Sequence, residues 1–244
     1  MHAPAPLIPA ELLLTAYRAG IFPMSDDRED DEVFWVEPRR RAIVPIDGFR
    51  CSRSLARVLR HERFRVTLNA DFAGVMDACA APRADHPKTW ISRRIAMSYR
   101  ALHLAGHAHS LECWLGDEMV GGLYGVAFGR VFCGESMFSR APDASKVALA
   151  WLAALLRRGD FRLHDCQFMT PHLASLGAVE VSREAYRALL ADAAGAGAVL
   201  GAEAGASDGA AAALAAAFDS LLAEAAGRAS SPGKLIAQSL THTS

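Results

Sequence analysis

Three polar side chains stand inside apolar segments typical of strands: Glu135, Asp165 and Gln167. The carboxylates can bind a proton, and the amide can hold a hydrogen-bond donor. Burying an unpaired carboxylate is costly, so such groups are either paired or used in chemistry. Residues two apart in a strand share a face, and we therefore expect Asp165 and Gln167 to point the same way. A carboxylate that accepts from the amide NH₂ group leaves the amide oxygen free to hold an incoming amine. The pattern indicates either an amine-handling site or a structural hydrogen-bond network at a sheet rim.

Cys166 lies between Asp165 and Gln167 and offers a second chemistry, that of a thiol nucleophile with His164 or a more distant histidine as its base. Alternation along a strand places Cys166 on the opposite face from its two neighbours. A buried structural cysteine is therefore the favoured interpretation.

A metal or a nucleotide cofactor is not expected. His103, His107, His109 and Cys113 invite a zinc interpretation, but their spacing matches none of the common ligand patterns. No GxxxxGK[ST] loop or strand–GxGxxG–helix unit occurs. The glycines of residues 121–129 favour bulges or close backbone approach, with a ligand base or ribose lying against them as the alternative.

Charge is unevenly distributed along the first third of the chain. Residues 26–37 carry seven acids against Arg28, whereas residues 39–65 carry nine arginines against two acids, a local net of +7. On a helix predicted over 53–62, Arg53, Arg57 and Arg60 share one face and are candidates to follow a phosphate backbone. A solvated helix face is the alternative. Trp35 and Trp90 are either core residues or platforms for an unstacked base.

The composition of the whole chain narrows the protein class. It has 244 residues, 52% hydrophobic content, a mean hydropathy of +0.13 and a net charge of −1, so no overall field favours nucleic acid. Five scattered cysteines favour reduced thiols in the cytoplasm. We find no run of about 18 apolar residues and no signal peptide. No membrane partner is therefore expected.

The periodicity predicts an α+β fold with a mixed sheet. Helices are expected over residues 9–19, 53–62, 71–80, 92–105, 143–158 and 182–192, and strands over 34–36, 42–46, 66–68, 110–115, 119–127, 130–138 and 161–168.

Residues 193–233 are rich in Ala and Gly, with a helix predicted over 210–226, a mobile linker elsewhere and a short docking strand over 234–240. The expected division is a basic N-terminal domain over residues 1–100, a catalytic domain over 101–192 and a partly flexible extension over 193–244.

Several blocks together resemble one family, the bacterial leucyl/phenylalanyl-tRNA–protein transferases. The resemblance covers residues 7–191, and its most specific part is the series GESMFSR (134–140), DCQ (165–167) and HLASLGA (172–178). Other blocks are LLLTAYRAGIFPMS (12–25), FWVEPRRRAIVP (34–45), TWIS (89–92), LHLAGHAHSLECW (102–114), GGLYGVAFGRVFCGESMFSR (121–140) and DASKVAL (143–149).

The resemblance implies an enzyme that takes Leu or Phe from aminoacyl-tRNA and joins it to proteins with N-terminal Arg or Lys, which marks them for degradation. It implies no cofactor and a second domain resembling the N-acyltransferases that use acyl-CoA. Nothing in the sequence demands a dimer, so a monomer is expected.

The resemblance also implies roles for individual residues. Asp165 and Gln167 would assist the acceptor amine, and Glu135 would belong to the catalytic pocket. The basic N-terminal segment, with the arginine face at 53, 57 and 60, would contact the acceptor stem. The Leu or Phe side chain would lie against Met137, Leu123, Leu152 and Leu156, and the 3′ adenosine against Trp35 and Trp90.

The chain departs from the family pattern in two places. His164 stands where an aliphatic residue is expected, and residues 193–244 have no counterpart in the resemblance.

Two rival functions remain at this stage. An acetyltransferase using acyl-CoA would need a Q/R-x-x-G-x-G/A loop, which the sequence lacks. A non-catalytic RNA-binding module would use the arginine face and leave the polar cluster without a role.

Overall fold

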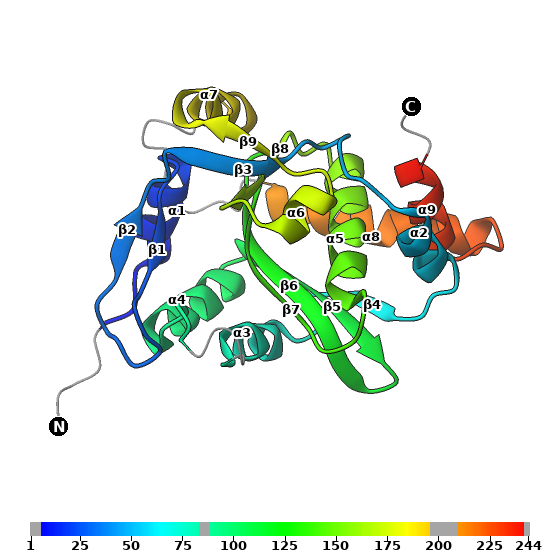
Figure 1. The fold of residues 1–244 in the computed structure, drawn as a ribbon, viewed down its shortest axis with the longest axis horizontal. Coiled ribbons are helices and arrows are strands. Elements are labelled where there is room, and N and C mark those ends of the chain that lie inside the picture. The colour runs from blue at the N-terminus through cyan, green and yellow to red at the C-terminus, as the bar shows by residue number, and fades with distance from the viewer. Residues whose placement is uncertain (1–5, 83–87, 196–208, 242–244) are drawn as a thin grey trace.

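The computed structural model describes residues 6–82, 88–195 and 209–241, and it confirms an α+β fold built on a mixed seven-stranded sheet (Figure 1). Within these residues, neighbouring strands of this sheet are antiparallel apart from β7 and β8, which run parallel. In spatial order the strands are β4 (Arg65–Leu68), β5 (Ala108–Leu115), β6 (Glu118–Phe128), β7 (Val131–Ser139), β8 (Leu163–Gln167), β3 (Arg40–Val44) and β9 (Val179–Ser182). A separate antiparallel pair consists of β1 (Phe22–Met24) and β2 (Phe34–Val36).

Helices cover both faces of the sheet, and the core consists of two buried clusters (Figure 1). One cluster includes α2 (Arg53–Arg60), α5 (Ala144–Arg158), α8 (Ala210–Gly227), α9 (Pro232–Thr241) and the short α6 (Pro171–Ser175). The other includes α1 (Ala10–Arg18), α3 (Phe72–Ala80), α4 (Arg93–Leu104) and α7 (Arg183–Ala194).

Side-chain caps fix where most of these helices begin. Ser52, Ser92 and Ser182 accept backbone N–H bonds three residues on. Helix α5 is different, because Asp143 precedes it at φ 70° and caps no N–H group with its side chain. Its carboxylate instead pairs with Lys146 at 3.1 Å.

The glycines of β6 allow close packing, as predicted. A Cβ at Gly121 would lie 2.5 Å from that of Ala144, so glycine lets the start of α5 approach β6. A Cβ at Gly125 would lie 2.4 Å from the carbonyl oxygen of Cys133 on β7. These two contacts bring α5 and β7 against the centre of β6.

The sheet continues across the domain boundary expected near residue 100, because β3 and β4 lie in the same sheet as β5–β8. The expected three-part division of the chain stays a prediction.

The C-terminal extension forms two helices within the described residues. The helix expected over 210–226 is confirmed as α8, but the strand expected over 234–240 is wrong, since this segment forms α9. An apolar run of this length does not distinguish strand from helix by its pattern alone. The linker expected to be mobile includes residues 196–208, which lie outside the described residues.

Helix α8 bears on the expectation that no run of about 18 apolar residues occurs. Among the described residues it is the one helix long and apolar enough to cross a membrane by length and composition. It carries Asp219 and Glu224, and it buries Leu214 and Leu221 in the core cluster shared with α5. Its length and composition alone are weak evidence for a membrane span.

Candidate active site

The central parallel pair of strands separates at its carboxyl end. Strands β7 and β8 pair over residues 131–133 and 163–165. Beyond that point, among the residues that the structure describes, β7 pairs only with β6, while β8 continues along β3. The separation opens a gap in the middle of the sheet, between the two core clusters.

A β-bulge on each side of this gap redirects the polar side chains. On β7, Ser136 faces Tyr124 and Gly134 faces Gly125, so Glu135 is an extra residue without a partner on β6. On β8, Gln167 faces Ala42 and Asp165 faces Ile43, which leaves Cys166 as the extra residue. Gln167 then takes a left-handed conformation at φ 62°, which is uncommon for a side-chain-bearing residue.

A cavity of about 850 Å³ occupies the gap. This volume is typical of a site for a small organic molecule or part of a larger one. Residues 134–140 of β7 and its loop form one wall, and β8 contributes His164, Cys166 and Gln167. Helix α5 contributes Ser145, Leu149 and Leu152.

Asp165 is fully buried and held by a bidentate ion pair with Arg41, whose side chain is 2% exposed. Arg41 Nε donates to Oδ1 at 2.8 Å and Nη2 to Oδ2 at 2.5 Å. Arg41 also donates to the carbonyl oxygen of Gly20 at 3.0 Å, and its guanidinium lies over the rings of Phe22 and Tyr186. The Tyr186 hydroxyl donates to Asp165 Oδ2 at 3.0 Å.

The Asp165 carboxylate fixes the backbone of Gln167 rather than its side chain. Oδ1 accepts from the Gln167 N–H at 2.9 Å, which stabilises the left-handed turn. The Gln167 amide NH₂ donates instead to Glu135 Oε1 at 2.7 Å. The group that orients the amide is therefore Glu135, and the sequence reasoning assigned this role to Asp165 because it could not foresee the bulge.

Glu135 is 8% exposed and receives a second hydrogen bond from Tyr99, whose hydroxyl donates to Oε2 at 3.2 Å. The hydroxyls of Tyr99 and Tyr17 hydrogen-bond each other in turn. Burial raises the pKa of Glu135 from 4.5 to about 7, although the hydrogen bonds from Tyr17 and Gln167 act in the opposite direction. The carboxyl group can therefore gain or lose a proton near neutrality.

The structure brings most of the expected apolar pocket together. Leu123, Met137 and Leu152 line the cavity, whereas Leu156 lies fully buried in the core and is not among the lining residues. Leu156 follows Leu152 by one helical turn along α5, deeper in the same core cluster.

The two tryptophans occupy different positions. Trp90 lines the cavity, whereas Trp35 on β2 is 41% exposed and is not among the lining residues. Two aromatic residues that the sequence reasoning did not single out, Phe22 and Phe168, also line the cavity and meet edge to face at 5.7 Å.

His164 and Cys166 face the cavity as uncharged groups. Burial lowers the pKa of His164 to about 4, so the imidazole is neutral at physiological pH. Burial raises the pKa of Cys166, whose sulfur lies 3.7 Å from His164 Nε2. A thiol held in its protonated form is a poor nucleophile, which supports the structural interpretation of this cysteine.

Within the described residues, no three His, Cys, Asp or Glu side chains are placed to hold a metal ion. His103, which the zinc interpretation invoked, stacks on Phe72 at 4.3 Å and contacts the Ala108 carbonyl through Nδ1.

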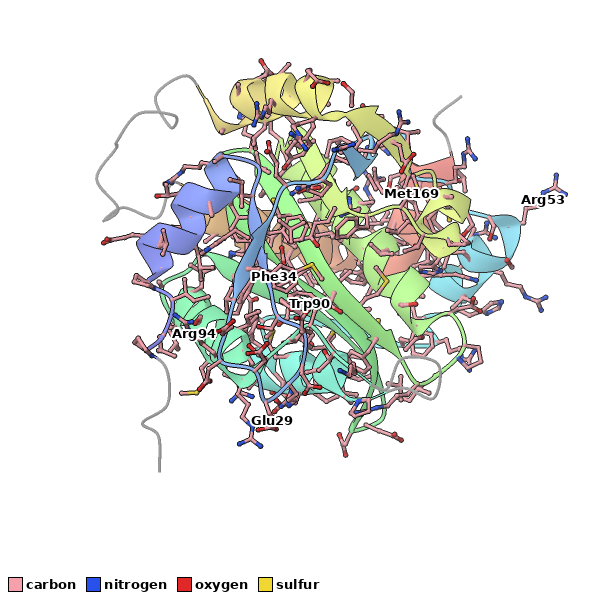
Figure 2. All side chains as sticks on the ribbon, turned by 60° about the vertical axis from the view of Figure 1, so that its left-hand side comes forward. Glu29, Phe34, Arg53, Trp90, Arg94 and Met169 are labelled. Carbon is pink, nitrogen blue, oxygen red and sulfur yellow. The ribbon has the colours of Figure 1, made fainter. Side chains whose placement is uncertain are left out.

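The basic segment separates into buried, paired and free arginines. Arg41 is buried, and Arg40 pairs with Glu180 at 3.2 Å. Arg53, Arg57 and Arg60 are exposed on α2 and form no ion pair with any other described residue. Figure 2 shows Arg53 projecting away from the body of the protein.

The sequence reasoning missed the residues that hold the polar cluster, namely Arg41, Tyr17, Tyr99 and Tyr186. Arg41 stands in a run of three arginines and looks like its exposed neighbours. One signal was available, because strand alternation distinguishes Arg41 from Arg40 by face.

The Arg41–Asp165 pair leads to a stability prediction. Arg41→Met should lower the free energy of unfolding by ~3–5 kcal/mol, because it leaves Asp165 as an uncompensated buried charge. Arg40→Met removes an exposed pair of the neighbouring arginine and should cost only about 0–1 kcal/mol. Urea unfolding of both variants measures the difference.

The double variant Arg41→Met, Asp165→Asn should recover part of the lost stability, since no buried charge remains unpaired. An Arg41→Met protein as stable as Arg40→Met would show that this ion pair does not hold the site.

Comparison with known proteins identifies the family. A family model described as leucyl/phenylalanyl-tRNA protein transferase matches residues 43–191, and the model of that family's N-terminal domain matches residues 8–39. The chain is 60% identical to the leucyl/phenylalanyl-tRNA–protein transferase of Novosphingobium aromaticivorans over 97% of both chains. Identity to the enzyme of the same name from Rhizorhabdus wittichii is 57%, over 81% of this chain and 80% of that one.

These matches cover both the β1–β2 region and the strands that frame the cavity. The chain belongs to the leucyl/phenylalanyl-tRNA–protein transferase family.

Proposed function

We propose that this protein transfers Leu or Phe from aminoacyl-tRNA to the N-terminal Arg or Lys of acceptor proteins, which marks them for degradation. The observation that carries the proposal is the cavity at the strand separation, where Glu135 and Gln167 meet an apolar pocket. The transferase name shared by the relatives supports the donor and acceptor classes.

The donor side chain would enter between β6, β7 and α5. Leu123, Met137 and Leu152 line this part of the cavity, and Leu149 adds a further apolar wall. The neutral His164 imidazole leaves no charge there to oppose an apolar side chain. Discrimination among apolar side chains should be graded, because one methylene is worth only about 1–3 kcal/mol in such a pocket.

The 3′ adenosine would stack on aromatic residues that line the same cavity. Trp90, Phe22 and Phe168 provide such surfaces, since bases stack on aromatic rings irrespective of their sequence. Trp35, exposed on β2, is opposite Pro23 of β1 and would extend this surface outside the cavity.

The proposed reaction exchanges an ester for an amide and needs neither ATP nor a cofactor. The acceptor amine nitrogen attacks the ester carbonyl carbon, a C–N bond forms, and the C–O bond to the ribose breaks. The amine loses a proton and the ribose oxygen gains one. Positioning the two reactants can supply roughly 7–11 kcal/mol in favourable cases.

Gln167 would hold the amine through its side-chain oxygen. Because its NH₂ group already donates to Glu135, the oxygen is the part of the amide left to accept a hydrogen from the amine. Asp165 would act as a positioning residue, since it fixes the Gln167 backbone and is itself fully buried. Glu135 would orient the amide or attract the cationic acceptor side chain.

The acceptor stem of the tRNA would lie along the exposed face of α2. Arg53, Arg57 and Arg60 are spaced along one side of this helix and have no anionic partner among the described residues. Phosphate contacts of this kind release counterions, so binding should weaken steeply with salt.

Three finer expectations belong to the same proposal. The hairpin strands β5–β7 followed by the parallel β7–α5–β8 crossover support a likeness to the N-acyltransferases that use acyl-CoA. Action as a monomer is a further expectation. A reaction that consumes aminoacyl-tRNA supports a cytoplasmic location.

The transfer assay tests the reaction class. Radiolabelled leucine on tRNA should move to a test protein with N-terminal Arg when neither ATP nor CoA is present. A matched protein with N-terminal Ala should stay unlabelled. Binding of the tRNA without transfer to either protein would favour a non-catalytic RNA-binding module instead.

The role of Gln167 leads to a kinetic prediction. Gln167→Ala should lower kcat by about 10²–10⁴-fold, the range found when a group that positions a proton transfer is removed. The only other glutamine of the chain, Gln238, is exposed on α9, and Gln238→Ala should leave kcat unchanged. Equal turnover by the two variants would contradict the proposed role.

The raised pKa of Glu135 leads to a pH prediction. Since the ionised carboxylate accepts from the Gln167 amide more strongly than the protonated form does, kcat/KM for Leu-tRNA should rise as pH passes upward through about 7. The acceptor amine also titrates, with a pKa of about 8, in every variant. The ratio of kcat/KM between wild type and Glu135→Gln therefore isolates the titration of Glu135. A ratio that does not change between pH 6 and 8, about one unit either side of the Glu135 pKa, would contradict the prediction.

A further inference from the structure

The C-terminal helices α8 and α9 lie outside the part of the chain that the family models match, which ends at residue 191. They nevertheless pack on the body of the protein, against α5 and α2 (Figure 1). Figure 1 shows α9 beside α2, and α2 is the helix that carries the free arginines.

Helix α9 approaches the backbone of α2 closely. A Cβ at Gly233 would lie 2.1 Å from the carbonyl oxygen of Leu59, so the contact requires glycine. The Gly233 N–H donates to Glu62 Oε1 at 3.4 Å, just beyond the end of α2. The approach therefore fixes the C-terminal end of α2 relative to the start of α9.

The remainder of this contact is apolar and buried. Leu55 and Leu59 of α2 belong to the same core cluster as Leu235, Ile236 and Leu240 of α9. These α2 residues lie on the face opposite the arginines, so α9 supports the arginine face from behind.

Two arginines at the end of α5 tie the extension to the body. Arg157 donates to the Ser239 carbonyl at 3.0 Å and pairs with Asp47 at 3.0 Å, in the loop that leads into α2. Arg158 donates to Glu224 of α8 at 2.5 Å. The end of α5 thereby connects both extension helices and the entry to α2.

We propose that α8 and α9 are a positioning element for the aminoacyl-tRNA: they hold α2 in the orientation at which Arg53, Arg57 and Arg60 meet the phosphates of the acceptor stem. The inference rests on the proposed function and adds a role for a segment beyond the matched family region. It assigns the extension to tRNA binding and not to the transfer chemistry, since the residues of α8 and α9 do not line the main cavity.

Two glycines of the extension provide a matched test. Gly233→Ala places a methyl group against the Leu59 carbonyl, whereas Gly227→Ala, at the end of α8, meets nothing within 4 Å. Gly233→Ala should raise KM for Leu-tRNA roughly three- to tenfold and flatten the salt dependence of binding, with kcat unchanged. Gly227→Ala should leave all three quantities as in wild type.

A donor without an acceptor stem distinguishes a role of the extension in positioning the tRNA from a general role in folding. Leucyl-adenosine, aminoacylated on the ribose, fills the cavity but carries no acceptor stem to reach α2. Gly233→Ala should use this donor with unchanged kcat/KM. Equal losses of kcat/KM with leucyl-adenosine and with Leu-tRNA would indicate only a general structural role for the extension and would overturn the inference. No loss of kcat/KM with either donor would overturn it as well.

A double-mutant cycle tests whether the extension acts through the arginine face. Arg57→Gln removes one of the three charges and should itself raise KM for Leu-tRNA. Combined with Gly233→Ala it should raise KM by less than the product of the two single effects, because a displaced helix no longer places Arg57 on a phosphate. Independent effects, which multiply, would overturn the inference.

If Gly233→Ala lowers the melting temperature by several degrees, the milder Ile236→Val, which removes a single buried methyl group, replaces it in both tests. Absence of transfer by the wild-type protein would refute the proposed function. Transfer by wild type with an unaffected Gly233→Ala variant would refute only the inference about the extension.

Discussion

The ion pair between Arg41 and Asp165 is the interaction on which the arrangement of the site depends. Its two partners lie on β3 and β8, and further contacts add the Gly20 carbonyl, the Phe22 ring and Tyr186 of α7. Removing both charges from water is costly, and only a fully bonded, bidentate geometry offsets that cost. Four parts of the chain must therefore be in place together before Asp165 can hold the left-handed turn at Gln167.

The candidate site lies where β7 and β8 separate, next to this ion pair. Two bulges place Glu135 and Gln167 on opposite strands of the gap and within hydrogen-bonding distance, at 2.7 Å. Burial then moves the pKa of Glu135 toward neutrality, while the amide oxygen of Gln167 remains available. The cavity thus combines this polar pair with apolar walls from β6, β7 and α5.

Much of this architecture follows from local patterns in the sequence. The serine caps of α2, α4 and α7, the β5–β6 hairpin and the long helix α5 are short-range features, and Glu135, Asp165 and Gln167 stand out as polar residues among apolar ones. The bulges are not predictable in this way, because period-2 alternation assumes that no residue is extra. Arg41 stands in a run of arginines, and the composition of that run does not mark it as buried. The segment of α9 is predicted as a strand because a short apolar segment fits the period of a helix as well as that of a strand.

The part of the apolar wall that α5 contributes is separate from the elements that carry Glu135 and Gln167. Leu149 and Leu152 belong to α5, whereas Glu135 and Gln167 belong to β7 and β8. Under the proposed function, substitutions in α5 would therefore alter the selected donor side chain without disturbing the residues proposed to assist peptide-bond formation. Related enzymes would then be free to differ in the residue that they add to an N-terminus while the proposed bond-forming groups stay the same.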